Sequence, residues 1–114
     1  MHGWAAAKKD LMALPVDVRK FFGHALDFAQ RGGRHAAAKV LKGFGGAGVL
    51  EIVENDQGNT YRAAYTVKFR EAVFVLHVFQ KKSESGIAPP KPDMDIIRER
   101  LKVAEKISQE MRHE

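Results

Sequence analysis

The chain has 114 residues and no cysteine, so it is long enough for one hydrophobic core and has neither a disulfide framework nor a thiolate site. Hydrophobic residues make up 45% and charged residues 29%, which excludes a disordered chain, and the net charge of +5 predicts a polyanionic partner such as nucleic acid, or an acidic protein. We expect a single cytoplasmic domain over residues 1–114, with no signal peptide and no transmembrane helix.

The first third of the chain predicts a helical hairpin. Ala5 to Leu14 is alanine-rich and stops before Pro15, which suits the first turn of a second helix that ends at Gly32 and Gly33. Apolar residues recur in the second helix at spacings of three and four: Val18, Phe21, Phe22, Ala25, Leu26 and Ala29. This spacing favours packing against a core over an aromatic platform for nucleic acid.

A basic stretch follows the hairpin, and it is interpreted either as a solvated loop or as a surface that contacts anions. Its residues are Arg31, Arg34, His35 and Lys39. The next stretch has the glycine spacing of a dinucleotide-binding loop at Gly43, Gly45 and Gly48. Such a loop needs a helix after the glycines, whereas Val49 to Glu54 predicts a strand, so we interpret the glycines as a turn or a close backbone approach.

An antiparallel meander of three strands is predicted for the middle of the chain. Val49 to Glu54 is followed by a hairpin turn over Asn55 to Asn59 and by a second strand, Thr60 to Phe69. A short turn at Arg70 to Ala72 leads to the third strand, Val73 to Ser83. The second strand alternates cleanly, which predicts one core face with the two tyrosines and one face of cations that includes Arg62 and Lys68.

The third strand, VFVLHVFQKKS, is a short apolar run of the kind found in buried central strands. Strict alternation places Val73, Val75, His77, Phe79 and Lys81 on one face. Lys81 and Lys82 are interpreted either as charges that discourage aggregation of an apolar strand or as functional cations. His77 is likewise either a hydrogen-bonded core residue or a site residue.

The last predicted element is a helix after a proline-containing loop at Ser83 to Pro92. It starts at Asp93 or Asp95, and its apolar stripe is Ile97, Leu101, Ala104, Ile107 and Met111. Charged residues, including Arg98 and Arg100, occupy the remaining faces.

The order of these pieces, and above all HVFQKKS followed by PxxDI and a basic helix, resembles the RelE/ParE superfamily of bacterial toxins. Within it, the chain is similar to the HigB-like, phage-derived branch of type II toxin–antitoxin systems, over about Trp4 to Lys106. Relatives usually carry a strand before the tryptophan, whereas here Met1 to Gly3 precede it, so we expect that edge strand to be missing or minimal.

The resemblance implies a RelE-like α+β fold in which an N-terminal helical hairpin packs on a twisted antiparallel sheet of three to four strands, with a C-terminal helix. It also implies a ribosome-dependent mRNA endonuclease held inactive by a cognate antitoxin, often a helix-turn-helix protein of the Xre type. Operator DNA is contacted only through that antitoxin, and no membrane is involved. ParE relatives share the fold but act on DNA gyrase, so a non-nuclease toxin and a degenerate binding-only module stay open.

Cleavage of RNA without a metal needs a base for the 2′-hydroxyl, a cation at the phosphorane and an acid for the leaving oxygen. We expect Arg62 to stabilise the phosphate, because its planar guanidinium matches phosphate oxygens. Lys81 or Lys82 is the candidate base, whose pKa neighbouring cations lower, and His77 is the candidate acid or a stacking group. We expect no cofactor and no metal.

Further cations are expected to contact RNA or the ribosome. These residues are Arg34, Lys39, Lys42, Lys68 and Arg70.

Overall fold

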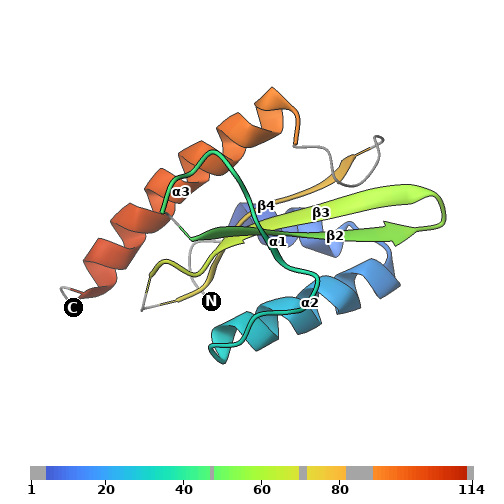
Figure 1. Ribbon diagram of the computed structural model, residues 1–114, viewed down its shortest axis with the longest axis horizontal. Coiled ribbons are helices and arrows are strands. Elements are labelled where there is room, and N and C mark those ends of the chain that lie inside the picture. Colours follow the sequence, from blue (N-terminus) through green and yellow to red (C-terminus); the bar gives the residue numbers. More distant parts are fainter. Residues whose placement is uncertain (1–4, 47, 70–71, 82–88, 113–114) are drawn as a thin grey trace.

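The computed structural model describes residues 5–46, 48–69, 72–81 and 89–112. The elements along the chain are α1 (Ala5–Met12), α2 (Val16–Gln30), β1 (Lys39–Val40), β2 (Val49–Asp56), β3 (Asn59–Thr66), β4 (Phe74–Lys81) and α3 (Lys91–Arg112). The four strands form one antiparallel sheet in the order β1-β2-β3-β4. Helix α2 lies on one side of the sheet and α3 on the other, with α1 beside β4 (Figure 1). The predicted α+β fold is confirmed.

Helix α2 begins at Val16, one residue later than predicted, because Pro15 is the extended N-cap residue rather than part of the first turn. Its buried residues are Val18, Phe22, Ala25, Leu26 and Ala29. Phe28 lies off this stripe and is 45% exposed. Helix α1 ends at Met12, two residues before the predicted Leu14. Helix α3 begins at Lys91, two residues before the predicted Asp93.

Two hydrophobic clusters fill the space on either side of the sheet. The α2-side cluster joins residues of α1 and α2 to Leu50, Ile52, Tyr61, Ala63, Tyr65, Val73, Val75 and Val78. The α3-side cluster joins α3 to Leu41, Val49, Ala64, Phe74 and Leu76. Because both clusters draw on β3 and β4, these strands are buried on both faces.

The hairpin between β2 and β3 closes with two residues, Gln57 and Gly58. Both have positive φ, at 49° and 83°, and Asp56 pairs with Asn59 on either side of them. Positive φ at both central residues matches the twist of the flanking strands, which is why this turn type is favoured in hairpins. The turn predicted over Asn55 to Asn59 is confirmed, and fewer residues lie outside the strands than predicted.

The predicted core face of Thr60 to Phe69 is confirmed, because Tyr61, Ala63 and Tyr65 lie in the α2-side cluster, whereas the predicted cation face is wrong. On the face predicted to carry cations, Arg62, Ala64 and Thr66 are all buried. The physical reason is the position of α3, which covers that face and turns the alternate positions into core positions. Lys68 is exposed, but it lies beyond Thr66, where β3 ends.

Strict alternation along β4 fails at a β-bulge. Val75 pairs with Tyr65 and His77 pairs with the neighbouring Ala64, so Leu76 is an extra residue on β4. Val75 belongs to the α2-side cluster, whereas both Leu76 and His77 lie toward α3. The predicted face that joined His77 to Val73 and Val75 is therefore wrong, because the bulge reverses the alternation after Leu76.

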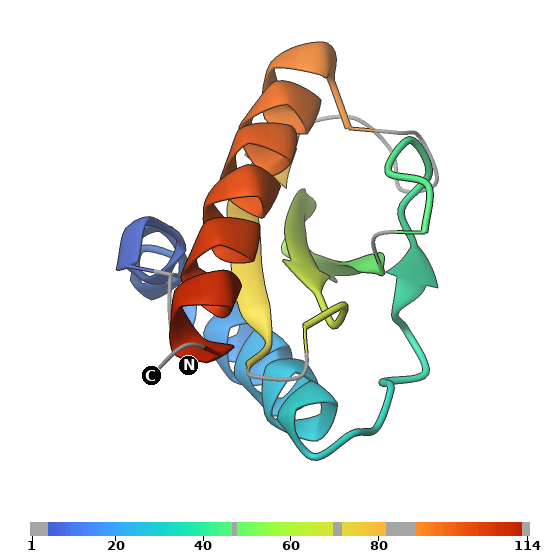
Figure 2. The same cartoon turned by 90° about the vertical axis from the view of Figure 1, so that its left-hand side faces the viewer.

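The glycine-rich segment confirms the predicted close backbone approach. The amide of Val67 donates a hydrogen bond to the Gly48 carbonyl at 3.1 Å, and a Cβ on Gly48 would lie 3.3 Å from the Lys68 nitrogen. Gly43 and Gly48 also have positive φ, at 102° and 62°. Figure 2 shows the chain from the end of α2 to this segment running along the side of the sheet remote from α1, where it adds the short edge strand β1.

Candidate functional site

Arg62 lies on β3 with its side chain 1% exposed, and its Nη1 is 3.1 Å from Oε2 of Glu51 on β2. The two residues lie on the α3 side of the sheet, where Glu51 pairs in register with Ala64. A buried guanidinium is stable in a fold only when an opposite charge and hydrogen bonds compensate its desolvation. In this conformation Arg62 is covered, so contact with a phosphate requires a neighbouring group to move.

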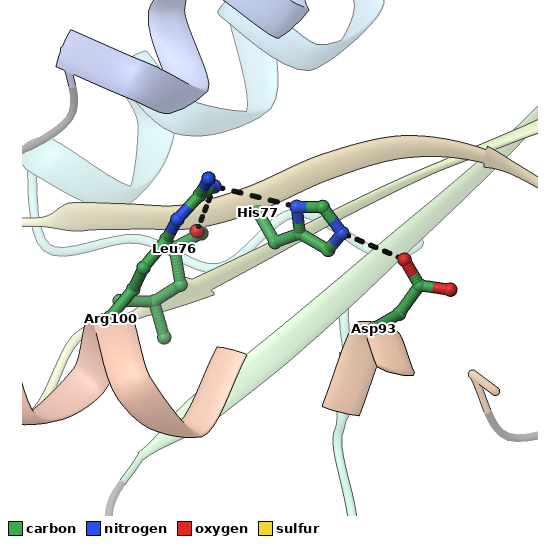
Figure 3. A network of polar contacts seen from close by, with 4 residues as sticks. All are labelled: Leu76, His77, Asp93 and Arg100. Carbon is green, nitrogen blue, oxygen red and sulfur yellow. Dashed lines mark hydrogen bonds and ion pairs between the residues drawn. The ribbon is translucent and has the colours of Figure 1, made fainter. Parts of the chain in front are cut away.

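His77 lies at the centre of a polar network that joins β4 to α3 (Figure 3). Its Nε2 is 2.9 Å from Oδ1 of Asp93, and its Nδ1 is 3.4 Å from Nη1 of Arg100. The same Nη1 donates a hydrogen bond of 2.9 Å to the carbonyl oxygen of Leu76. His77 is buried, at 7% exposure, and both of its ring nitrogens are engaged within the chain.

The bulge in β4 explains why this network exists. If Leu76 took part in regular alternation instead of forming a bulge, His77 would share the side of Val75 and lie in the apolar α2-side cluster. With it, His77 reaches the side chains of α3, and the Leu76 carbonyl accepts a bond from Arg100 where the ladder is interrupted.

An aromatic ring connects the two buried polar groups. The rings of His77 and Phe79 are stacked, with centroids 4.5 Å apart and an interplanar angle of 15°. Phe79 is half-buried and pairs in register with Arg62. The structure thus brings Arg62, Phe79 and His77 together on the α3 side of the sheet.

The predicted lysines end β4. Lys81 is its last residue and pairs in register with Thr60, two positions beyond the Arg62–Phe79 pair. The Lys81 side chain, and Lys82 and Arg70 as a whole, lie outside the described residues. Their predicted roles stay predictions.

The other predicted contacts to RNA are exposed. Arg34 donates a hydrogen bond of 3.3 Å to the Ala38 carbonyl, and the Lys68 ammonium lies 5.6 Å from the centre of the Phe69 ring. Lys39 and Lys42 lie on and after the edge strand β1. Lys39 pairs in register with Glu51, the ion-pair partner of Arg62.

Tyr65 is fully buried on the other side of β3, in the α2-side cluster. Its hydroxyl has no hydrogen-bond partner among the residues that the structure describes. Burial raises the pKa of this phenol above its ordinary value of 10.0, and the Arg34 guanidinium offsets part of the rise.

In the described ranges, no three histidine or acidic side chains come together in a way that would hold a metal ion. No helix in the same ranges has the length and apolar character needed to cross a membrane.

The site contains two residues whose roles the sequence analysis missed. It assigned Asp93 only to the start of the last helix, and Arg100 to a charged outer face. Asp93, Ile97, Arg100 and Ala104 follow one another at spacings of four, three and four. Asp93 therefore lies one step before the apolar stripe and Arg100 lies within it, so the helical spacing would have placed both against the sheet.

The comparisons with known proteins identify the family. The family model described as Phage derived protein Gp49-like (DUF891) matches residues 9–102. The chain belongs to this family. Gp49-like proteins are a family of RelE/HigB-like toxins, which accords with the α+β fold. Neither the curated proteins nor the solved structures give a significant match to this Gp49-like chain.

Proposed function

We propose that this Gp49-like chain is the toxin of a type II toxin–antitoxin pair and that it cleaves mRNA on the ribosome. The match to the Gp49-like family over residues 9–102 is the observation that carries the toxin assignment. The net charge of +5 supports a nucleic-acid target. A cognate antitoxin, of the Xre helix-turn-helix type, neutralises the toxin and mediates any contact with operator DNA.

The proposed cleavage site lies where β3 and β4 pair near the end of β4. Arg62 stabilises the charge that develops on the scissile phosphate, once the phosphate takes the place of Glu51 as its anionic partner. Lys81 or Lys82 removes the proton of the 2′-hydroxyl, the 2′-oxygen attacks phosphorus, and the bond to the 5′-oxygen breaks as that oxygen takes a proton from water and leaves as a hydroxyl. The register of the strands supports this arrangement, because Lys81 pairs two positions beyond the partner of Arg62.

The test is inducible expression in bacteria, scored by growth and by primer extension on a translated message. The variants are Arg62→Lys, which keeps the charge and loses the planar fork, and Lys82→Ala. Lys102→Ala, which removes an exposed lysine from α3, is the matched control. We expect the wild type and Lys102→Ala to cleave the message, and Lys82→Ala to lose about 10²- to 10⁴-fold of the activity if Lys82 is the base.

A second candidate is favoured by the engaged state of the buried polar groups. Arg62 is covered and paired with Glu51, and both ring nitrogens of His77 have partners. Such an interior suits a toxin that acts by binding, as a ParE-like gyrase poison does. That activity predicts double-strand DNA breaks and an SOS response while transcripts stay intact during growth arrest, which is the result that would overturn the nuclease.

A further inference from the structure

The contacts of His77 assign its protons. A guanidinium has five N–H donors and no acceptor, so the group of Arg100 that faces Nδ1 requires a lone pair there. The proton of the neutral ring is then on Nε2, where it is donated to the Asp93 carboxylate at 2.9 Å. The opposite tautomer would place N–H against N–H at Arg100 and a lone pair against a carboxylate oxygen at Asp93.

The same contacts connect α3 to β4 at two positions along the helix. Asp93 lies in the first turn of α3, and Arg100 lies two turns further along the helix. Arg100 reaches both the His77 ring and the Leu76 carbonyl, so it bridges the two residues of the bulge. The described part of β4 and the N-terminal half of α3 are therefore connected directly by side-chain contacts.

The network also reaches the proposed cleavage site through one ring. His77 stacks on Phe79, which pairs with Arg62 in the sheet. With two partners on its nitrogens and Phe79 on its face, the imidazole has little freedom to rotate or to approach a substrate.

From these contacts we infer that Asp93 and Arg100 are positioning residues that act through His77. They hold His77 as the neutral Nε2–H tautomer, and His77 in turn fixes Phe79 and the end of β4 that carries Lys81. His77 is on this basis a structural support for the site and neither its general acid nor its general base. The role in positioning rests on the proposed function, whereas the tautomer and the fastening of α3 do not.

The first arm of the experiment measures the tautomer by nitrogen-15 NMR of the histidine rings, with His77 assigned by its loss in His77→Gln. We expect Nε2 of His77 to be protonated and Nδ1 to be unprotonated in the wild type. Arg100→Met removes the donor to Nδ1 and should give a mixture of the two tautomers. Arg98→Met, which changes a neighbouring exposed arginine of α3, should leave the signals unchanged.

The second arm measures cleavage of a translated message on purified ribosomes. His77→Gln keeps an N–H donor for Asp93 and has no titratable proton, and Asp93→Asn keeps an acceptor for Nε2–H. We expect both to retain cleavage within about tenfold, whereas loss of a true acid would cost about 10²- to 10⁴-fold. His77→Ala and Asp93→Ala should fall further than these two variants, because they remove the contact between β4 and α3. Circular dichroism of each variant separates loss of activity from loss of folding.

The outcomes distinguish the two proposals. A wild-type His77 protonated on Nδ1, or tautomers that Arg100→Met leaves unchanged, would overturn the network. Equal losses in His77→Gln and His77→Ala, with folding intact, would restore His77 as the acid and overturn its supporting role. If the wild type cleaves no message, the nuclease fails, and the NMR arm still decides whether Asp93 and Arg100 hold His77.

Discussion

Arg62 and Glu51 form an ion pair inside the sheet layer, with 3.1 Å between Nη1 and Oε2 and side chains that are 1% and 14% exposed. Their strands are adjacent, and the pair lies on the side of the sheet that α3 covers. An exposed pair elsewhere in the chain, Arg31 with Asp27 at 3.2 Å, has side chains that are 78% and 54% exposed. The two ion pairs have similar N–O distances, but the first is buried and the second is exposed to solvent.

Glu51→Gln should therefore destabilise the protein more than Asp27→Asn. Loss of the Glu51 charge leaves the Arg62 guanidinium buried with a weaker acceptor, which we expect to cost roughly 1–3 kcal/mol in the free energy of unfolding. Asp27→Asn removes a screened surface pair and should change it by less than about 0.5 kcal/mol. Urea denaturation measures both. Equal small effects would show that Glu51 contributes little to holding Arg62.

The raised pKa of Tyr65 predicts a loss of stability at high pH. The unfolded state releases the phenol proton near the ordinary pKa of 10.0, while the folded state keeps it to higher pH because the phenol is buried. Above about pH 10 the unfolded state binds fewer protons, so the free energy of unfolding falls as pH rises until the folded pKa is passed. Below that window Tyr65 contributes no pH dependence.

Tyr65→Phe should remove this contribution. We expect the wild type to lose stability relative to Tyr65→Phe as the pH rises above the ordinary pKa of 10.0, measured by urea denaturation at each pH. Tyr61→Phe, which alters the neighbouring tyrosine of β3 and keeps Tyr65, is the control. Parallel pH profiles for the wild type and Tyr65→Phe would contradict the prediction.

Two phenylalanines of α2 test which side of that helix packs on the sheet. Phe22 is fully buried in the α2-side cluster, and Phe28 is 45% exposed. Phe22→Ala should lower the free energy of unfolding by about 3–5 kcal/mol through lost burial and a cavity. Phe28→Ala should cost less than about 1 kcal/mol. Thermal unfolding of the two variants measures the difference, and similar losses would place the wrong side of α2 against the core.

Gly48 and Gly46 make a matched pair in the segment before β2. Gly48 has φ of 62°, and a Cβ there would meet the Lys68 backbone at 3.3 Å, whereas a Cβ on Gly46 would meet nothing within 4 Å. Gly48→Ala should destabilise the protein by about 1–2 kcal/mol, because a side chain is strained in the left-handed region and crowds the neighbouring backbone. Gly46→Ala should be neutral or slightly stabilising. Chemical denaturation compares them, and a neutral Gly48→Ala would remove the close approach as a reason for this glycine.

Local patterns predicted most of the fold. Pro15 marks the start of α2, the stripe from Val18 to Ala29 gives its buried side, and Asn55 to Asn59 gives the hairpin. Each of these signals depends on residues close in sequence. The two-residue strand β1 carries no such signal, because it exists only through its pairing with β2.

The candidate site was predicted less well, since its geometry depends on contacts distant in sequence. Arg62 looked like a surface cation because nothing in β3 shows that α3 covers its outer face. Pairing of Arg62 with Glu51 joins residues 11 apart, and pairing of His77 with Asp93 joins residues 16 apart. Asp93 and Arg100 were missed because a carboxylate and a guanidinium on a helix usually mark its solvent side.

The single additional residue at Leu76 gives β4 two segments of opposite phase. Up to Val75, the odd-numbered residues of this segment face α2. From His77 onward, the odd-numbered residues face α3. The bulge at Leu76, rather than the hydropathy of Val75 or His77, thus decides which helix the imidazole meets. Deleting Leu76 would therefore restore an unbroken ladder, with Val75 opposite Tyr65 and His77 opposite Ala64, and would leave the imidazole on the side of the sheet that faces α3.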